Sequence, residues 1–242
     1  KKIDITLKNL TFSYTEDKTT LKNISFSIKS GEKVAIIGAS GSGKTTISQL
    51  IAGFYAKNSG DILYNDISID NISKKSLREH LFLVLQMPIL FNNTLRFNLT
   101  MGENISNEKI KEALKIAQLN SMLENLPDGL DTIVGKMGIR LSGGQRQRLS
   151  IARMILANPS VVIFDESTSA LDVQTETKLF ENLENILKDK TVITIAHRLS
   201  TVKNASKIFV LEDGELVQSG THMELEDEIG HYKEFVKHQL LN

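Results

Sequence analysis

The sequence predicts an α/β fold with a mainly parallel sheet, an N-terminal antiparallel β subdomain and an inserted α-helical subdomain. Continuous apolar runs bounded by turn residues predict buried strands at 34–37, 81–85, 161–164, 192–195 and 208–211. Helical periodicity separates several of these runs, which is typical of a parallel sheet covered by helices. Before the first run, apolar and polar residues alternate, which indicates strands with one buried face.

The N-terminal third of the chain shows these patterns in order. Alternation over residues 3–14 predicts one or two strands, a polar turn follows at 15–20, and alternation resumes at 24–28. The apolar run at 34–37 then ends on Gly38, as expected for a buried strand that enters a tight loop. We expect a helix from about residue 44 to residue 55.

The middle of the chain shows a different periodicity. From about residue 92 to residue 157, helical periodicity dominates and strand signals are scarce, which predicts a helical subdomain inserted between two core strands. Residues 173–187 form a further amphipathic pattern, and residues 232–240 form another at the C-terminus.

Composition limits the function classes. The 242 residues include 29 Lys and Arg against 29 Asp and Glu, so no net positive charge favours nucleic acid, and we expect no nucleic-acid partner. The absence of cysteine excludes disulfides and thiolate metal sites. No apolar run is long enough for a membrane-spanning helix, and the chain begins with Lys1, so we expect it to be a piece of a longer protein.

The strongest chemical signal lies between the predicted strand at 34–37 and the helix that follows. This segment fits the phosphate-loop pattern, in which glycines let backbone amides close around phosphate oxygens at a helix N-terminus. Lys44 would neutralise the β- and γ-phosphates, and the Thr45 hydroxyl would bind Mg²⁺. A flexible glycine–serine turn is the alternative. The expected binding residues are Gly38, Ser40, Gly41, Ser42, Gly43, Lys44, Thr45 and Thr46.

The apolar run at 161–164 ends on two acids. Asp165 at a strand end can hold Mg²⁺, and Glu166 beside it can take the proton from an attacking water. A helix N-cap at Asp165, followed by a first-turn acid, is the alternative interpretation.

A second anion site is predicted where a helical pattern begins after Leu141. Its candidates are Ser142, Gly143, Gly144 and Gln145, because exposed amides at a helix N-terminus attract anions. Two such helix starts with a single lysine-bearing loop suggest that two copies share their nucleotides. An ordinary N-cap before an amphipathic helix is the alternative.

These motifs together resemble the nucleotide-binding domains of ABC transporters. The phosphate loop, the Leu-Ser-Gly-Gly-Gln segment at 141–145, the acids at 165–166, Ser-Ala-Leu-Asp at 169–172 and Ile-Ala-His-Arg at 195–198 follow the order and spacing of that family over nearly the whole chain. The resemblance implies a P-loop NTPase core spanning residues 1–242, which binds ATP and Mg²⁺.

The resemblance also implies further site residues. Tyr14 would stack on adenine, with Phe12 as a rival on the same strand and a simple core position as the alternative. Gln86 would reach Mg²⁺ and the attacking water, and His197 would contact the γ-phosphate. Asp172 would cross a dimer interface. The implied catalytic residues are therefore Lys44, Gln86, Glu166 and His197, and the implied metal ligands are Thr45, Gln86 and Asp165.

The residues that flank these motifs are similar to those of the exporter-type subfamily. The implied function is ATP hydrolysis by two domains that enclose two Mg-ATP and drive transport of an unidentified substrate. The implied partners are a second such domain and a transmembrane domain N-terminal to this chain, at the cytoplasmic face of a bacterial inner membrane. A soluble ABC-type ATPase and an importer subunit are the alternatives. One departure is Lys136, where exporters of this type usually carry an acid in a loop thought to touch the membrane domain.

Overall fold

The computed structural model describes residues 1–85, 87–165 and 173–240. Gln86, Glu166 and Asp172 therefore lie outside the described residues. The chain divides into two compact units, one comprising Lys1–Leu83, Ser160–Ser167 and Asp189–Asn242, the other Val84–Pro159 and Thr168–Lys188. Among the described helices, none has both the length and the apolar character needed to cross a bilayer.

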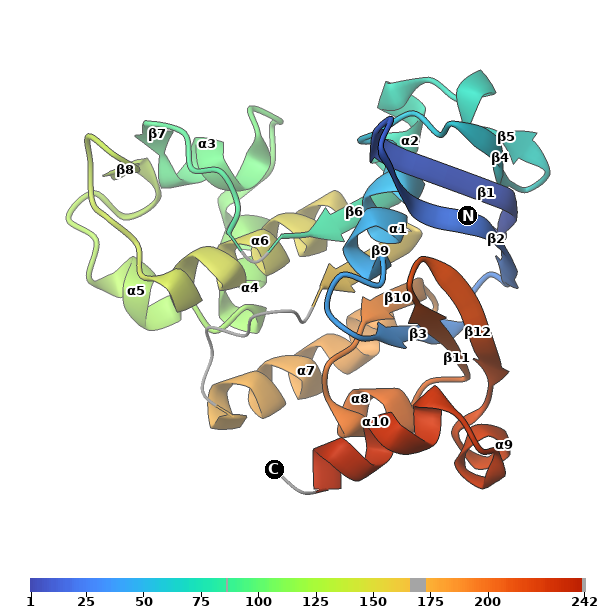
Figure 1. Cartoon of the computed structure of the whole chain (residues 1–242). Coiled ribbons are helices and arrows are strands. Elements are labelled where there is room, and N and C mark those ends of the chain that lie inside the picture. The colour runs from blue at the N-terminus through green and yellow to red at the C-terminus, as the bar shows by residue number, and fades with distance from the viewer. Residues whose placement is uncertain (86, 166–172, 241–242) are drawn as a thin grey trace. The chain divides into compact units, whose positions relative to one another are not determined.

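A six-stranded sheet forms the centre of the first unit (Figure 1). Its strands, in spatial order, are β12 (Glu215–Gly220), β11 (Lys207–Glu212), β3 (Lys33–Gly38), β10 (Thr191–Ile195), β9 (Val161–Asp165) and β6 (Leu81–Val84). β3 pairs in parallel with both β10 and β11, and β10 pairs in parallel with β9, whereas β12 is antiparallel to β11. The predicted mainly parallel sheet is confirmed.

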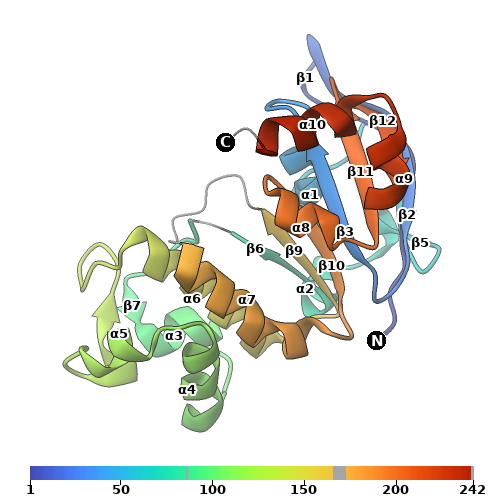
Figure 2. The ribbon, with the colours of Figure 1, turned by 90° about the horizontal axis from the view of Figure 1, so that it is seen from below.

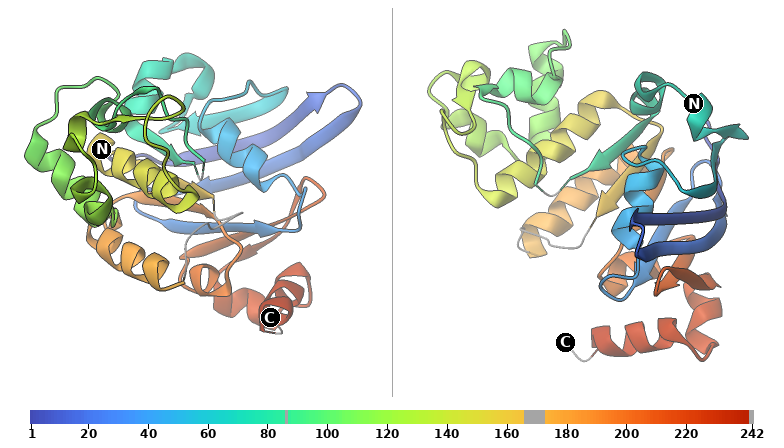
Figure 3. Two further views of the ribbon diagram at one scale, coloured as in Figure 1. Left: turned by 90° about the vertical axis from the view of Figure 1, so that its left-hand side faces the viewer. Right: turned by 45° about the horizontal axis from the view of Figure 1, so that its top comes forward.

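A second, antiparallel sheet is built mostly from the N-terminal residues. Its spatial order is β2 (Lys18–Ile28), β1 (Ile5–Thr15), β4 (Ser59–Tyr64) and β5 (Ile67–Ser68). Figure 3 shows the long blue strands β1 and β2 side by side. Only residues 16 and 17 lie between them in the chain. The predicted antiparallel β subdomain is confirmed, although its turn is shorter than the polar stretch at 15–20 indicated.

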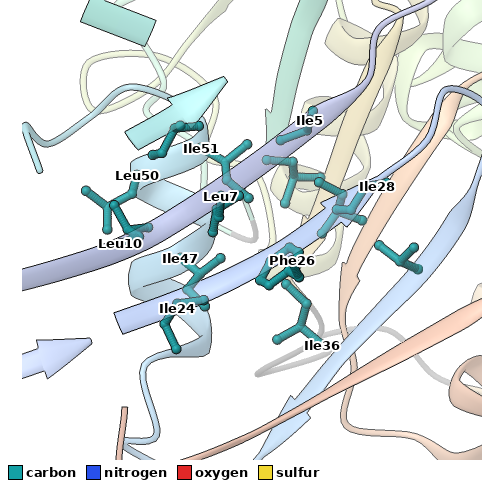
Figure 4. Packing of buried hydrophobic residues seen from close by; sticks show 14 of the residues in the cluster. Ile5, Leu7, Leu10, Ile24, Phe26, Ile28, Ile36, Ile47, Leu50 and Ile51 are labelled. Atoms are coloured by element: carbon teal, nitrogen blue, oxygen red, sulfur yellow. The ribbon is translucent and has the colours of Figure 1, made fainter. Parts of the chain in front are cut away.

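Helix α1 (Lys44–Ile51) packs in the main core between these two sheets. Its buried side chains Ile47, Leu50 and Ile51 meet residues of β1 and β2 on one side, and Ile36 of β3 belongs to the same cluster (Figure 4). Burial of each such side chain contributes roughly 1.5–3 kcal/mol. The core therefore fixes the helix that follows the phosphate loop to both sheets.

On the other face of the six-stranded sheet, the C-terminal helices pack against β3 and β11 (Figure 2). Because strand side chains alternate, Ala35 and Ile37 face away from the α1 core and pack with Val202 and Tyr232. These helices are α8 (Leu199–Lys203), α9 (His222–Asp227) and α10 (His231–Leu240). β3 is thus buried on both faces, which explains its continuous apolar run.

The second unit is mostly helical. Its helices are α3 (Leu95–Thr100), α4 (Asn107–Ile116), α5 (Asn120–Glu124), α6 (Gly143–Ala157) and α7 (Val173–Leu187), with a two-stranded ribbon of β7 (Asn93–Thr94) and β8 (Ile133–Val134). α6 packs against α3 and α4, and α4 also contacts α7. α6 ends where Asn158 adopts a left-handed conformation before Pro159, a usual helix stop.

One predicted helix is shorter in the structure, and some elements were not predicted. The helix after the phosphate loop was expected to reach about residue 55, but α1 ends at Ile51, because Gly53 takes up a left-handed φ of 75° and closes the helix. Four further elements of the first unit, α2 (Lys74–His80), β4, β5 and β12, lack a continuous apolar run of the length that predicted the buried strands.

Candidate functional site

The phosphate loop connects β3 to α1, as the sequence predicts. Gly43 caps α1 in a left-handed conformation with φ of 102°, and a Cβ there would lie 2.5 Å from Leu21 Cδ2. Only glycine meets both conditions without strain. Ser42 is buried, whereas Ser40 and Gly41 are exposed at the tip of the loop.

Lys44 is buried beneath this loop. Its ammonium Nζ donates to the carbonyl oxygens of Gly38 at 2.7 Å and Ala39 at 2.8 Å. Burial lowers the pKa of Lys44, while the charges of Asp165 and Glu212 act in the opposite direction. A cation held by weak carbonyl partners inside a loop of backbone amides suits an oligophosphate, whose oxygens make stronger, charge-assisted hydrogen bonds.

Thr45 and Asp165, both predicted as metal ligands, lie together. Thr45 Oγ1, in the first turn of α1, donates to Asp165 Oδ2 at the end of β9 over 3.1 Å. Hydroxyl and carboxylate oxygens are ligands that Mg²⁺ prefers, and Mg²⁺ usually takes only one or two from the protein. The pair therefore fits a magnesium ion next to the lysine that would bind phosphate.

A pocket of about 530 Å³ opens over the same loop. Tyr14 lines it and is half exposed, whereas Phe12 is buried, so Tyr14 is the aromatic residue of this strand that a ligand can reach. The Tyr14 hydroxyl lies 2.9 Å from Thr46 Oγ1 and donates to Gln49 Oε1 at 3.1 Å. These contacts orient the ring from α1.

Sequence patterns missed several residues that line the pocket or hold a lining residue in place. Gln49 holds Tyr14, and Asp213 in the turn between β11 and β12 belongs to the pocket wall together with Lys18 and Lys22. The Asp-Gly pair at 213–214 between apolar stretches was an available hairpin signal. It predicts a turn but not where that turn packs.

His197 follows β10 at the edge of the sheet that carries the phosphate loop. The register places Ile195 beside Ile36 of β3 and beside Asp165 of β9. His197, two residues beyond Ile195, is half-buried at the level where β3 enters its loop. The predicted base Glu166, next to Asp165 in the sequence, lies outside the described residues.

The predicted second anion site lies at the N-terminus of α6. Ser142 and Gln145 form a reciprocal cap: Ser142 Oγ accepts from the Gln145 amide at 3.1 Å, and Gln145 Oε1 accepts from the Ser142 amide at 2.9 Å. Gly143 and Gly144 form the first turn of the helix, where backbone amides have no carbonyl one turn earlier in the helix. The N-cap alternative and the anion-site prediction therefore use the same residues.

The loop around Lys136 joins the β7–β8 ribbon. Met137 donates its amide to Asn92 Oδ1 at 3.2 Å, and the Gly135 amide donates to the Ile139 carbonyl at 3.2 Å. Lys136 and Met137 are exposed at the tip of this closed loop.

Comparison with known proteins places this site in a family. The family model described as ABC transporter matches residues 21–169. The chain is 44% identical over 237 residues to an ATP-dependent lipid A-core flippase of Syntrophus aciditrophicus, covering 98% of this chain and 39% of that protein. It is 43% identical over 230 residues to the uncharacterized ABC transporter ATP-binding protein YwjA of Bacillus subtilis, covering 95% and 40%.

A solved structure supports the same family assignment. The bacterial Atm1-family ABC exporter with ATP bound matches with a TM-score of 0.91 and 38% identity, over 98% of this chain and 42% of that one. The chain thus spans about two-fifths of the length of these relatives. The family model matches more than half of the chain, and this match establishes that the chain belongs to the ABC transporter family.

Proposed function

We propose that this chain binds and hydrolyses ATP as the nucleotide-binding domain of an ABC exporter. The observation that carries the proposal is the arrangement around Lys44: its ammonium lies inside the phosphate loop, next to the Thr45–Asp165 pair. The similarity to an exporter with ATP bound supports the same choice of nucleotide. Tyr14 would stack on the adenine from the wall of the same pocket.

In the proposed reaction, the residues of the chain bind the nucleotide, orient the attacking water and accept one proton from it. The loop amides and Lys44 would hold the β- and γ-phosphates. Thr45, Gln86 and Asp165 would hold Mg²⁺, which when bound would offset the charge that develops on the transferred phosphoryl group. Glu166 takes the proton of the attacking water, which contributes roughly 10²- to 10⁴-fold to the rate. Gln86 and His197 orient that water and the γ-phosphate.

We propose that two such domains act together. Ser142, Gly143, Gly144 and Gln145 of one domain would close on a nucleotide held by the phosphate loop of the other, with Asp172 crossing the interface. The first-turn amides of α6 support this role, since they attract anions whichever domain supplies them.

The transporter partner would be a transmembrane domain, and the chain would act at the cytoplasmic face of a bacterial inner membrane. The names of the relatives, among them lipid A-core flippases, support an exporter whose substrate is unidentified. The exposed Lys136 loop would meet that domain through an acidic residue. If Lys136→Glu leaves substrate-stimulated hydrolysis by the whole transporter unchanged, this contact is wrong.

The test is the Mg-ATPase rate of this chain as a function of its concentration, with the oligomeric state followed in ATP. We expect the rate per chain to rise with concentration, and Glu166→Gln to abolish hydrolysis while still dimerising with ATP. Glu184→Gln, the same change at an exposed position of α7, is the matched control and should behave as the wild type. Normal hydrolysis by Glu166→Gln contradicts the base assignment, and a rate per chain independent of concentration contradicts the shared site.

A further inference from the structure

The turn between β11 and β12 contacts the phosphate loop, although no residue of the turn belongs to the loop. Gly214 donates its amide to the Ser42 carbonyl at 3.1 Å, and its own carbonyl accepts from the Lys22 amide at 2.8 Å. The turn therefore connects the phosphate loop to β2 through two backbone hydrogen bonds. Its other residue, Asp213, lines the nucleotide pocket.

Position 214 accepts only glycine. Its φ is +80°, and a Cβ there would lie 2.2 Å from the Thr20 carbonyl oxygen and 3.0 Å from its carbon. The obstacle is backbone, which cannot move aside as the end of a side chain can. A larger residue at this position must therefore push the turn away from β2 and from Ser42.

The hydrogen bond to Ser42 also fixes the next amide of the loop. The peptide between Ser42 and Gly43 is planar and trans, so its C=O and N–H point in opposite directions. Because the Ser42 carbonyl is directed at Gly214, the Gly43 N–H is held facing away from the turn. Gly43 caps α1 and lines the pocket, so this N–H is one of the donors that a bound anion would use.

We propose that Gly214 is a positioning residue of the nucleotide site, which keeps the Ser42–Gly43 peptide oriented for phosphate without contacting the nucleotide. The inference rests on the proposed function, because it assumes that the phosphate loop holds a nucleotide. It assigns part of the nucleotide affinity to a turn far away in the sequence. Since the peptide serves bound substrate and transition state alike, its loss should raise KM more than it lowers kcat.

The experiment compares Gly214→Ala with Gly31→Ala. Gly31 has a similar φ of +86°, but a Cβ there meets nothing within 4 Å, so its variant carries the backbone strain without the displacement. Binding of Mg-ADP and of inorganic pyrophosphate is measured for each chain, with thermal stability as a parallel readout. We expect Gly214→Ala to weaken both ligands by the same factor, roughly 10- to 100-fold, as for the loss of a hydrogen bond to a charged group.

Gly31→Ala should lower stability and leave both affinities unchanged. Equal affinity losses in the two variants, or none in Gly214→Ala, overturn the proposal. A wild-type chain that binds neither ligand contradicts the proposed function itself, which is a separate outcome.

A second measurement needs no variant and so remains decisive if Gly214→Ala does not fold. Amide hydrogen exchange of the wild-type chain is followed with and without Mg-ADP, in segments 38–46, 211–216 and 63–68. The last is a control, because Asn65 and Asp66 form another left-handed turn, between β4 and β5. We expect ADP to slow exchange at 38–46 and 211–216 and to leave 63–68 unchanged.

Protection of 38–46 without any change at 211–216 shows that the turn is not coupled to the loop and overturns the proposal. An absence of protection at 38–46 contradicts nucleotide binding by the loop, on which the proposal rests.

Discussion

At the scale of single residues, two consecutive threonines at the start of α1 direct their hydroxyl groups to different side chains. Thr45 Oγ1 donates to Asp165 of the β9 end, while Thr46 Oγ1 lies within hydrogen-bonding distance of the Tyr14 hydroxyl. The first hydroxyl thus contacts the proposed metal ligand Asp165, and the second contacts the aromatic residue that lines the pocket. The roles of Thr45 and Thr46 can therefore be tested independently.

Replacing Thr45 by valine keeps the shape of the side chain and removes the oxygen. We expect the Mg²⁺ concentration that half-saturates ATP hydrolysis to rise roughly tenfold or more, because a ligand to a charged group is lost. A Mg²⁺ titration of the ATPase rate measures it. Thr6→Val, which removes a hydroxyl that contacts only Ser27 Oγ at 3.1 Å among its described partners, is the control. An unchanged titration midpoint in Thr45→Val would exclude Thr45 as a metal ligand.

Among individual residues, those predictable from sequence share one property: their role is visible in a local pattern. Lys44 and Thr45 lie between a buried strand and a helix, and Asp165 ends another buried strand. Gln49 lies in no such pattern, and the Asp-Gly pair that contains Gly214 predicts only a turn. The importance of these two residues comes from their contacts: Gln49 accepts from the Tyr14 hydroxyl, and Gly214 donates to the Ser42 carbonyl. Tertiary packing decides those contacts.

At the scale of elements, two helices begin with the same reciprocal cap. In α6 the cap joins Ser142 and Gln145, and in α9 it joins Thr221 and Glu224. Each satisfies two backbone amides that the helix itself leaves unpaired. One cap lies in a predicted anion site, and the other does not.

We therefore expect Ser142→Ala and Thr221→Ala to lower the free energy of unfolding of the unit that carries each by about 1 kcal/mol. Only Ser142→Ala should also impair ATP-dependent dimerisation. Urea unfolding measures the first effect, and size-exclusion chromatography in ATP, in the Glu166→Gln background, measures the second. Dimerisation lost equally in both variants would assign Ser142 a purely structural role.

The buried Tyr232 of helix α10 should make the stability of the protein depend on pH. Tyr232 is fully buried, its hydroxyl lies 2.6 Å from His222 Nδ1, and burial together with the charge of Glu226 raises the pKa of Tyr232 to about 12. An unfolded tyrosine loses its proton near pH 10, so the unfolded state is favoured progressively as the pH rises from about 10 to 12. Stability linked to Tyr232 is therefore complete below pH 10 and lost above it.

Chemical unfolding between pH 8 and pH 12 tests this for the wild type and for Tyr232→Phe. The variant lacks the ionisable group, so its stability should fall less steeply above pH 10. Tyr55→Phe, which removes an exposed hydroxyl, is the matched control. Parallel profiles for the wild type and Tyr232→Phe would exclude Tyr232 as the source of the alkaline loss.

Strands could be predicted from sequence where nearly all of their side chains are buried. β3, β9, β10 and β11 are apolar along most of their length and were predicted, whereas β12 alternates between exposed and partly buried residues at the sheet edge and was not. β4 begins with Ser-Gly-Asp and gave no strand signal either. β12 lies at the edge of its sheet, whereas β4 lies between β1 and β5. Both take their pairing from neighbouring strands rather than from their own composition, which is why single-sequence patterns miss them.

At the scale of the whole molecule, the order of strands in the main sheet differs sharply from their order in the chain. β3 lies between β10 and β11, so the strand that leads into the phosphate loop is flanked by two strands from the last third of the sequence. The same late segment supplies Gly214, which contacts Ser42. Pairings of such long sequence separation slow folding, because the intervening chain must be closed into a loop before they form.

This arrangement has a consequence for synthesis on the ribosome. A nascent chain that carries the phosphate loop but has not yet released β11 and its turn lacks one flank of β3, and so we expect no nucleotide binding. Capture of stalled nascent chains on immobilised ADP should begin only once residues 207–220 have left the exit tunnel. Capture of shorter chains would contradict the expectation. Products truncated before that point would consequently bind no ATP, and nucleotide occupancy would mark chains whose main sheet is complete.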